Sequence, residues 1–195
     1  MKLPALSSQN RTLARTAGGL NLLLSILALM WLLEVADFAL WSLDLDFYGI
    51  HPRTLIGLRN ILFAPFLHVG FTHLLLNSIP FLFLGVLVLL RGKHDFIFVS
   101  IVAGVISGLG VWLFGGSHTI HLGMSGIIFG YLGFLLLRGF FERNLISTLL
   151  GGLAIFFYGG MLWGVLPLQA GVSWLGHLFG FIGGGVAAYL LTRGE

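Results

Sequence analysis

His121-Leu122-Gly123-Met124-Ser125-Gly126-Ile127-Ile128-Phe129-Gly130 is the stretch around which the chain is organised. It places Ser125 between glycines at the start of an apolar segment that runs on to Leu137. Small residues at such a place can simply let two membrane helices approach closely. The serine can also be a nucleophile, because unpaired N–H groups at the positive end of a helix dipole can stabilise an oxyanion. The rest of the chain decides between these interpretations.

The composition is that of an integral membrane protein. Of the 195 residues, 57% are hydrophobic and 9% are charged, with a mean hydropathy of +1.01, whereas a soluble domain carries roughly 25% charged residues. Apolar segments of about 18 residues or more can cross a bilayer as helices. The chain has about six of them, which predicts one compact all-α bundle over residues 20–192. The expected spans are 20–42, 71–91, 95–115, 122–138, 145–166 and 172–192.

The N-terminus has two interpretations. Residues 1–19 are polar and basic, and an apolar run follows them, which is also how a cleaved signal peptide begins. The run continues to Trp41 without a small-x-small cleavage site, so we favour a cytoplasmic lead-in over residues 1–19 and an uncleaved first helix. The chain has no cysteine, which excludes disulfides, thiolate metal sites and thiol nucleophiles.

Positive charges in this chain indicate membrane topology rather than nucleic-acid binding, although the pI is near 9.7. If the N-terminus is cytoplasmic, only Arg53 and Arg59 fall outside. Such an asymmetry predicts that both termini are cytoplasmic. We therefore expect a multi-pass protein of a bacterial or archaeal cell membrane. The eight residues on the inside would be Lys2, Arg11, Arg15, Arg91, Lys93, Arg138, Arg143 and Arg193.

The first external connection, residues 44–68, mixes charged with apolar side chains, and Pro52 and Pro65 break it. We expect pieces that lie in the outer interface of the bilayer.

Four polar side chains are predicted to lie at one depth in the bundle. His73 and Asn77 are four residues apart and share a helix face. They, Ser125 and His177 all fall in the first turns of helices that run from outside to inside. Polar groups in a membrane face the interior or a water-filled cavity. Each of the four alone would more commonly be a packing residue, but their joint placement favours a site.

Chemistry suggests a role for each of these groups. A neutral His177 could take the proton of the Ser125 hydroxyl and return it to a leaving amine. No carboxylate is expected at this depth, so the pair would lack an acidic third member. His73 and Asn77 can donate hydrogen bonds toward Ser125 and, with the Ser125 backbone N–H, form an oxyanion hole. We expect no metal site, because these residues do not supply a paired-histidine ligand set.

These residues resemble the rhomboid family of intramembrane serine proteases over residues 20–192. The family pattern His-x-x-x-x-His-x-x-x-Asn appears as His68, His73 and Asn77. The pattern Gly-x-Ser-Gly appears as Gly123 to Gly126, and the histidine ahead of spaced glycines appears as His177, Gly180 and Gly184. All three patterns occur in the family order.

The resemblance implies a Ser-His dyad without a cofactor. Ser125 would be the nucleophile and His177 the general base, with His73, Asn77 and the Ser125 N–H at the oxyanion. The family cuts transmembrane segments of other membrane proteins near the outer surface, often after a small residue. The fifth helix and the loop around Pro167 would be the lateral gate for substrate. Supporting positions would be His68, Gly123, Gly126, Phe129, Gly180 and Gly184.

Three positions depart from the family pattern. The Trp-Arg pair common in the first external loop is missing, and Leu58-Arg59 stands nearby. Phe129 replaces a tyrosine that often stacks on the histidine, and Gly176 stands where alanine is common. No departure removes a reacting group.

Other functions are weighed by their residue requirements. A zinc intramembrane protease needs His-Glu-x-x-His, which is absent, and an aspartic one needs paired acids that helices two to six lack. A catalytically idle protein that holds membrane clients remains an alternative, and so does a transporter or haem carrier that uses the histidines. The intact Ser125 and His177 argue against the idle protein.

Overall fold

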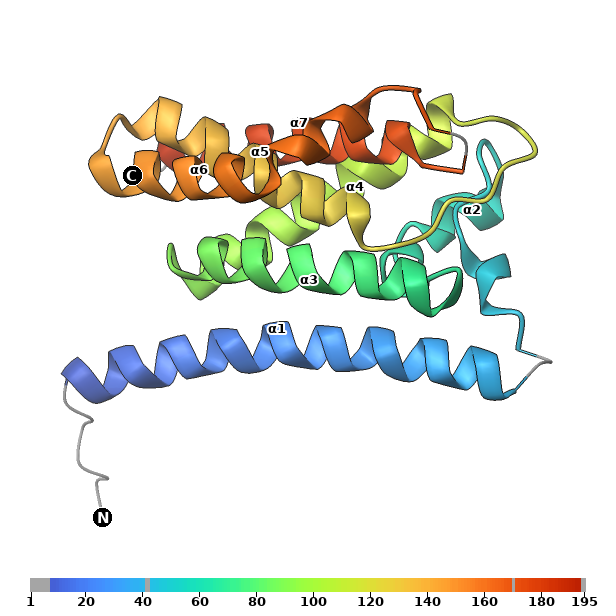
Figure 1. The fold of residues 1–195 in the computed structure, drawn as a ribbon, viewed down its shortest axis with the longest axis horizontal. Coiled ribbons are helices and arrows are strands. Elements are labelled where there is room, and N and C mark those ends of the chain that lie inside the picture. The colour runs from blue at the N-terminus through green and yellow to red at the C-terminus, as the bar shows by residue number, and fades with distance from the viewer. Residues whose placement is uncertain (1–7, 41–42, 170, 194–195) are drawn as a thin grey trace, which may run out of the picture.

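The computed structural model describes residues 8–40, 43–169 and 171–193, and for residues 8–16 only the backbone. Within these residues the protein is an all-α bundle whose long helices run along one common direction (Figure 1). The long helices are α1 (Ser8–Ala39), α3 (Gly70–Leu89), α4 (Lys93–Phe114), α5 (Ser125–Glu142), α6 (Leu145–Tyr158) and α7 (Trp174–Arg193). The short elements are η1 (Leu45–Tyr48), α2 (Leu55–Asn60), η2 (Ala64–Phe66) and η3 (Gly159–Val165).

Six helical segments of the described chain are long and apolar enough to cross a membrane, which confirms the predicted six-helix bundle. The fifth segment, Leu145–Val165, joins α6 to η3. Helix α1 begins at Ser8, inside the expected lead-in of residues 1–19, while residues 1–7, with Lys2, lie outside the described residues. The fourth helix was expected from residue 122 but begins at Ser125. It begins later because Gly123 has a φ of 115°, which a right-handed helix excludes.

The connection of residues 44–68, which we expect to be external, folds into short pieces at the end of the bundle opposite the start of α1 (Figure 1). Thr54 starts α2 by accepting the Gly57 N–H at 2.9 Å, and Pro65 lies in the first turn of η2. The Leu55 and Leu62 side chains are 85% and 67% exposed. Exposed leucines on α2 and in the turn that follows it suit the expected position at the membrane interface.

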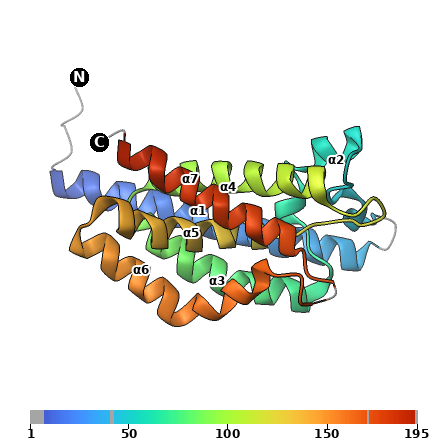
Figure 2. The ribbon, with the colours of Figure 1, turned by 90° about the horizontal axis from the view of Figure 1, so that it is seen from above.

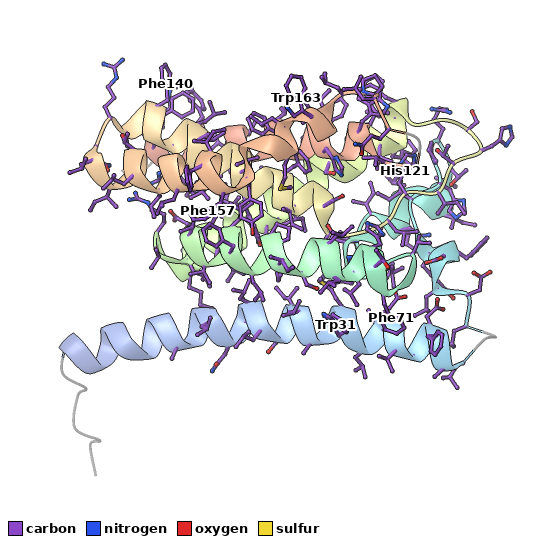
Figure 3. The ribbon with its side chains drawn as sticks, in the orientation of Figure 1. Trp31, Phe71, His121, Phe140, Phe157 and Trp163 are labelled. Atoms are coloured by element: carbon purple, nitrogen blue, oxygen red, sulfur yellow. The ribbon has the colours of Figure 1, made fainter. Side chains whose placement is uncertain are left out.

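Helix α5 is the centre of the bundle, because it packs against α3, α4, α6 and α7. From above, α3 and α6 lie on the opposite side of the bundle from α4 (Figure 2). Helix α1 lies at the edge against α3, where Trp31 donates its Nε1–H to Ser78 Oγ at 3.1 Å and its ring centroid lies 6.2 Å from that of Phe71 (Figure 3). The site residues on α3, α5 and α7 therefore come from helices in or beside the core.

Glycines set the contact between α5 and α7. A Cβ atom at Gly180 would overlap the Gly126 carbonyl group, and one at Gly184 would overlap the Gly130 carbonyl group. The two backbones touch directly at two successive turns. This is the close approach that small residues permit between membrane helices.

A buried ionic cluster ties the helices together at the other end of the bundle. Arg138 of α5 is only 2% exposed and pairs with Glu142 and Asp95. Glu142 also accepts from Arg91 at 2.7 Å and from the Ser147 hydroxyl at the start of α6. Buried charges are stable only when paired and hydrogen-bonded in this way. The cluster therefore anchors the first turn of α6.

We predict that Gly184→Ala destabilises the protein by about 1–3 kcal/mol, because the added methyl group forces the α5 and α7 backbones apart. Gly152→Ala in α6 is the matched control, since nothing lies within 4 Å of a Cβ there. The control should be neutral or gain up to about 1 kcal/mol from helix propensity. Thermal unfolding in detergent measures both, and equal stability of the two variants would contradict the packing described here.

Candidate functional site

The loop before α5 is shaped to present Ser125. The Gly123 N–H donates to the Ala64 carbonyl oxygen at 2.8 Å, and the Met124 N–H donates to His68 Nε2 at 3.4 Å. Gly123 has a φ of 115°, a region that disfavours any side chain. Hydrogen bonds to Ala64 of η2 and to His68 therefore hold this loop, and Ser125 is the first residue of α5.

Ser125 and His177 meet across the α5–α7 contact. The Ser125 Oγ atom lies 2.9 Å from His177 Nε2, and His177 Nδ1 lies 2.9 Å from the Gly164 carbonyl oxygen. A carbonyl oxygen can only accept, so Nδ1 carries the ring proton of a neutral imidazole. Nε2 is then an acceptor, and the Ser125 hydroxyl donates to it. This tautomer is the one that a base acting on serine requires.

Phe129 and Gly164 enclose the imidazole. The Phe129 ring stacks on His177 with centroids 4.1 Å apart and an interplanar angle of 8°. A Cβ at Gly164 would lie 2.9 Å from the Phe129 ring and 3.1 Å from His177 Nδ1, so η3 approaches closely because this residue has no side chain. The phenylalanine keeps the ring contact that the family pattern assigns to tyrosine.

His73 and Asn77 lie beside the loop that leads to Ser125, and each has an N–H group that its own hydrogen bonds leave available. His73 Nδ1 accepts the Val69 N–H at 3.3 Å, which leaves a proton on Nε2 of the neutral ring. Asn77 Nδ2 donates to the His73 carbonyl oxygen at 3.1 Å and keeps a second N–H. A Cβ at Gly123 would lie 3.0 Å from His73 Nε2 and 3.7 Å from Asn77 Nδ2. Both donors therefore face the backbone just ahead of Ser125, whose own N–H has no intrahelical acceptor.

A pocket of about 840 Å³ joins these groups. Its wall includes the four polar side chains expected at one depth, Ser125, His177, His73 and Asn77. Apolar residues of α3 and of the α6–η3 segment, among them Leu76, Ile79 and Met161, form another part of the wall, and the loops before α5 and α7 complete it. A cavity of this size with a few convergent polar groups suits a peptide segment as ligand.

Ser107 of α4 braces the contact from behind. Its hydroxyl donates to the Gly176 carbonyl oxygen at 2.8 Å, and a Cβ at Gly126 would overlap the hydroxyl. Ser107 thus contacts the residue after Ser125 and the residue before His177. Ser107 is not among the residues that the sequence singled out for the site. Because Gly176 accepts through its backbone oxygen, this bond does not depend on a side chain at that position.

The missing Trp-Arg pair of the first loop has a counterpart from other positions. Arg53 donates to two carbonyl oxygens at the end of α4, at 3.1 and 2.7 Å, and Trp112 Nε1–H donates to the Thr54 carbonyl oxygen at 2.7 Å. Arg59 instead donates to Asn60 Oδ1 at 3.1 Å. The loop is therefore anchored to α4 by an arginine and a tryptophan that sequence reasoning did not identify.

His68 lies outside the pocket wall, behind Met124, and is 3% exposed. His51, His94 and His118 lie away from the pocket wall. Among the described residues, no group of three or more His, Asp or Glu side chains is arranged to hold a metal ion.

Comparison with known proteins gives a family and several relatives. A family model described as "Rhomboid domain" matches residues 57–194. An uncharacterized protein of Mycobacterium tuberculosis is 41% identical to this chain, over 97% of this chain and 82% of its own length. An uncharacterized protein of Mycobacterium leprae is 43% identical, over 95% of this chain and 76% of its own length. A Bacillus subtilis protein with the name "Putative rhomboid protease YdcA" is 29% identical over 94% of this chain and 93% of its own length.

Burial, and to a smaller degree the nearby His73, lowers the pKa of His68 from its ordinary value near 6.5 to about 4. The unfolded chain binds this proton below about pH 6.5 and the folded protein does not, so stability present above that pH is lost as the pH falls to about 4. We predict that His68 contributes up to about 3 kcal/mol to this loss. His68→Gln keeps an acceptor for the Met124 N–H and should make the free energy of unfolding depend less on pH.

The free energy of unfolding, measured as a function of pH between pH 7 and pH 4, tests this prediction. His118→Gln, at an exposed loop position, is the control and should keep the wild-type slope. Identical slopes in the wild type and in His68→Gln would show that the buried imidazole is not the titrating group.

Proposed function

Because this chain belongs to the rhomboid family, we propose that it is a serine endopeptidase of the membrane that uses Ser125 as nucleophile and His177 as general base. Family membership and a relative named as a rhomboid protease support intramembrane protease activity. Substrates would be transmembrane segments of other proteins in the lipid bilayer.

The observation that carries this proposal is the chain of hydrogen bonds from Ser125 through His177 to Gly164. The first bond, Oγ to Nε2, is 2.9 Å long and gives the hydroxyl proton a direct path to the base. The second bond, Nδ1 to the Gly164 carbonyl oxygen, is also 2.9 Å and holds the required tautomer. An imidazolium formed during the reaction would keep both bonds, with Nε2–H turned toward oxygen.

The reaction would follow from this geometry in two halves. Ser125 Oγ attacks the scissile carbonyl carbon while His177 Nε2 takes its proton, and the negative oxygen is stabilised by the Ser125 N–H, His73 Nε2–H and Asn77 Nδ2–H. The C–N bond breaks as His177 returns the proton to the leaving amine, which leaves an acyl-enzyme. A water molecule then gives a proton to His177 Nε2 and attacks the ester carbonyl carbon. The bond to Ser125 Oγ breaks, His177 returns the proton to Oγ, and the peptide leaves as a carboxylic acid.

We further propose that the α6–η3 segment is the route by which substrate enters the pocket. A smaller share of this segment is buried than of α5, 22% against 50%. Its inner end is held by Glu142 and Ser147, whereas its outer end reaches the site at Gly164. A weakly packed outer end can move aside while the inner end stays anchored. The expected role of the Pro167 loop belongs to the same proposal.

The proposed topology places both termini in the cytoplasm and the site near the outer surface. The start of α1 and the end of α7 lie at one end of the bundle, and α2 lies at the other (Figure 1). The numbers of Lys and Arg residues in the sequence favour the end of the bundle that holds both termini as the cytoplasmic side. A fluorescent protein fused to the C-terminus should fluoresce if that end is cytoplasmic. A fusion that does not fluoresce, together with an active reporter of the external side, would reverse the assignment.

We predict that Ser125→Ala and His177→Ala each lower cleavage of a transmembrane peptide by at least about 1,000-fold, because each removes a reacting group. Asn77→Ala should cost about 100-fold, the loss of one oxyanion donor. The measurement is kcat with a fluorogenic peptide in proteoliposomes. Ser117→Ala, in an exposed loop, is the control and should be fully active.

Two results would contradict the proposed function. Cleavage that survives in Ser125→Ala would assign the reaction to another nucleophile. A folded wild type that binds the peptide without cutting it would favour the client-holding alternative.

A further inference from the structure

His121 makes contacts that the proposed chemistry does not use. It lies in the loop between α4 and α5, four residues before Ser125, and Figure 3 places it at the end of the bundle that holds α2. The ring lies between two hydroxyl groups, with Nε2 2.7 Å from Thr119 Oγ1 and Nδ1 2.7 Å from Ser173 Oγ. His121 and Ser173 also line the site pocket.

The direction of these hydrogen bonds follows from Thr119. Its hydroxyl donates to the Gly116 carbonyl oxygen at 2.7 Å, so toward His121 it can only accept. Nε2 therefore carries the proton of the neutral ring, and Nδ1 accepts the proton of the Ser173 hydroxyl. Burial lowers the pKa of His121, which favours this neutral ring.

Both partners of the His121–Ser173 bond are fixed to larger elements. The His121 backbone pairs with Ile50 in both directions, at 2.7 and 3.1 Å. Ser173 lies directly before α7, and its carbonyl oxygen accepts the His177 N–H of the first turn at 3.1 Å. The bond therefore joins the loop that leads to Ser125 with the first turn of the helix that carries His177.

We propose that His121 is a positioning residue that sets the separation of Ser125 and His177 through Ser173. The inference rests on the proposed function. Without this bond the first turn of α7 loses its tie to the α4–α5 loop and keeps the Ser107–Gly176 bond to α4. A misplacement of about 1 Å between reacting groups can cost about 100-fold in rate. The loss falls mainly on kcat, because both ring nitrogens of His121 bond to Thr119 and Ser173 and leave no polar atom for the peptide.

The test compares His121→Leu, Ser173→Ala and the double variant of the full chain in proteoliposomes. Each single variant should lower kcat by about tenfold or more with KM within about twofold, and the double variant should lose no more than the worse single one. Ser117→Ala removes a hydroxyl from the same α4–α5 loop without a partner on α7 and should be unaffected.

A conservative variant distinguishes positioning from general damage. Asparagine places its side-chain oxygen near the position of Nδ1, whereas glutamine reaches the position of Nε2. His121→Asn should therefore retain more activity than His121→Gln, although both replace an imidazole by an amide. Melting temperatures identify any variant that fails to fold, in which case Ser173→Ala, a smaller change, decides.

Three results would overturn the proposal: single variants that keep kcat within about twofold, losses that multiply in the double variant, and equal activity of the Asn and Gln variants. An inert wild type would instead contradict the proposed function. The positioning role is then read from the ¹⁵N resonances of the His177 ring, which Ser173→Ala should shift and Ser117→Ala should not. Unshifted resonances in Ser173→Ala would overturn it.

Discussion

The direct backbone contact between α5 and α7 is the constraint on which the site depends. Gly126 and Gly130 on α5 meet Gly180 and Gly184 on α7 with no room for a methyl group. Helices with larger residues at these positions would separate by several ångströms, beyond the reach of a hydrogen bond between Ser125 and His177. Helix packing in lipid has no hydrophobic driving force, and here the glycine contacts bring Ser125 and His177 to the distance that the proposed reaction needs.

In the proposed mechanism an uncharged carbonyl group orients the histidine. In water-soluble serine proteases a buried aspartate holds the histidine tautomer and stabilises the imidazolium. A carboxylate at this depth in a bilayer would carry a large desolvation cost. The Gly164 carbonyl oxygen fixes the same tautomer without a charge. It also makes the alignment of His177 depend on η3, the outer end of the segment through which we propose that substrate enters.

The sequence predicted the helical bundle well because the length of an apolar segment is a local property that decides whether it can cross the membrane. It also predicted that Ser125, His177, His73 and Asn77 would lie at one depth, since each is a few residues from a helix start. Other contacts could not be predicted from the sequence. Gly164 acts through a backbone oxygen and leaves no side-chain signal. Arg53, Trp112 and His121 make contacts with loop segments whose paths depend on the complete fold.

Labelling with a serine-directed fluorophosphonate tests the activated Ser125 most directly. The detergent-purified wild type should gain one adduct, which peptide mass spectrometry should locate on Ser125, and His177→Ala should abolish the labelling because the hydroxyl then has no base. Labelling at another serine, or at Ser125 with undiminished rate in His177→Ala, would contradict the Ser125–His177 mechanism. A folded wild type that does not react would contradict it as well.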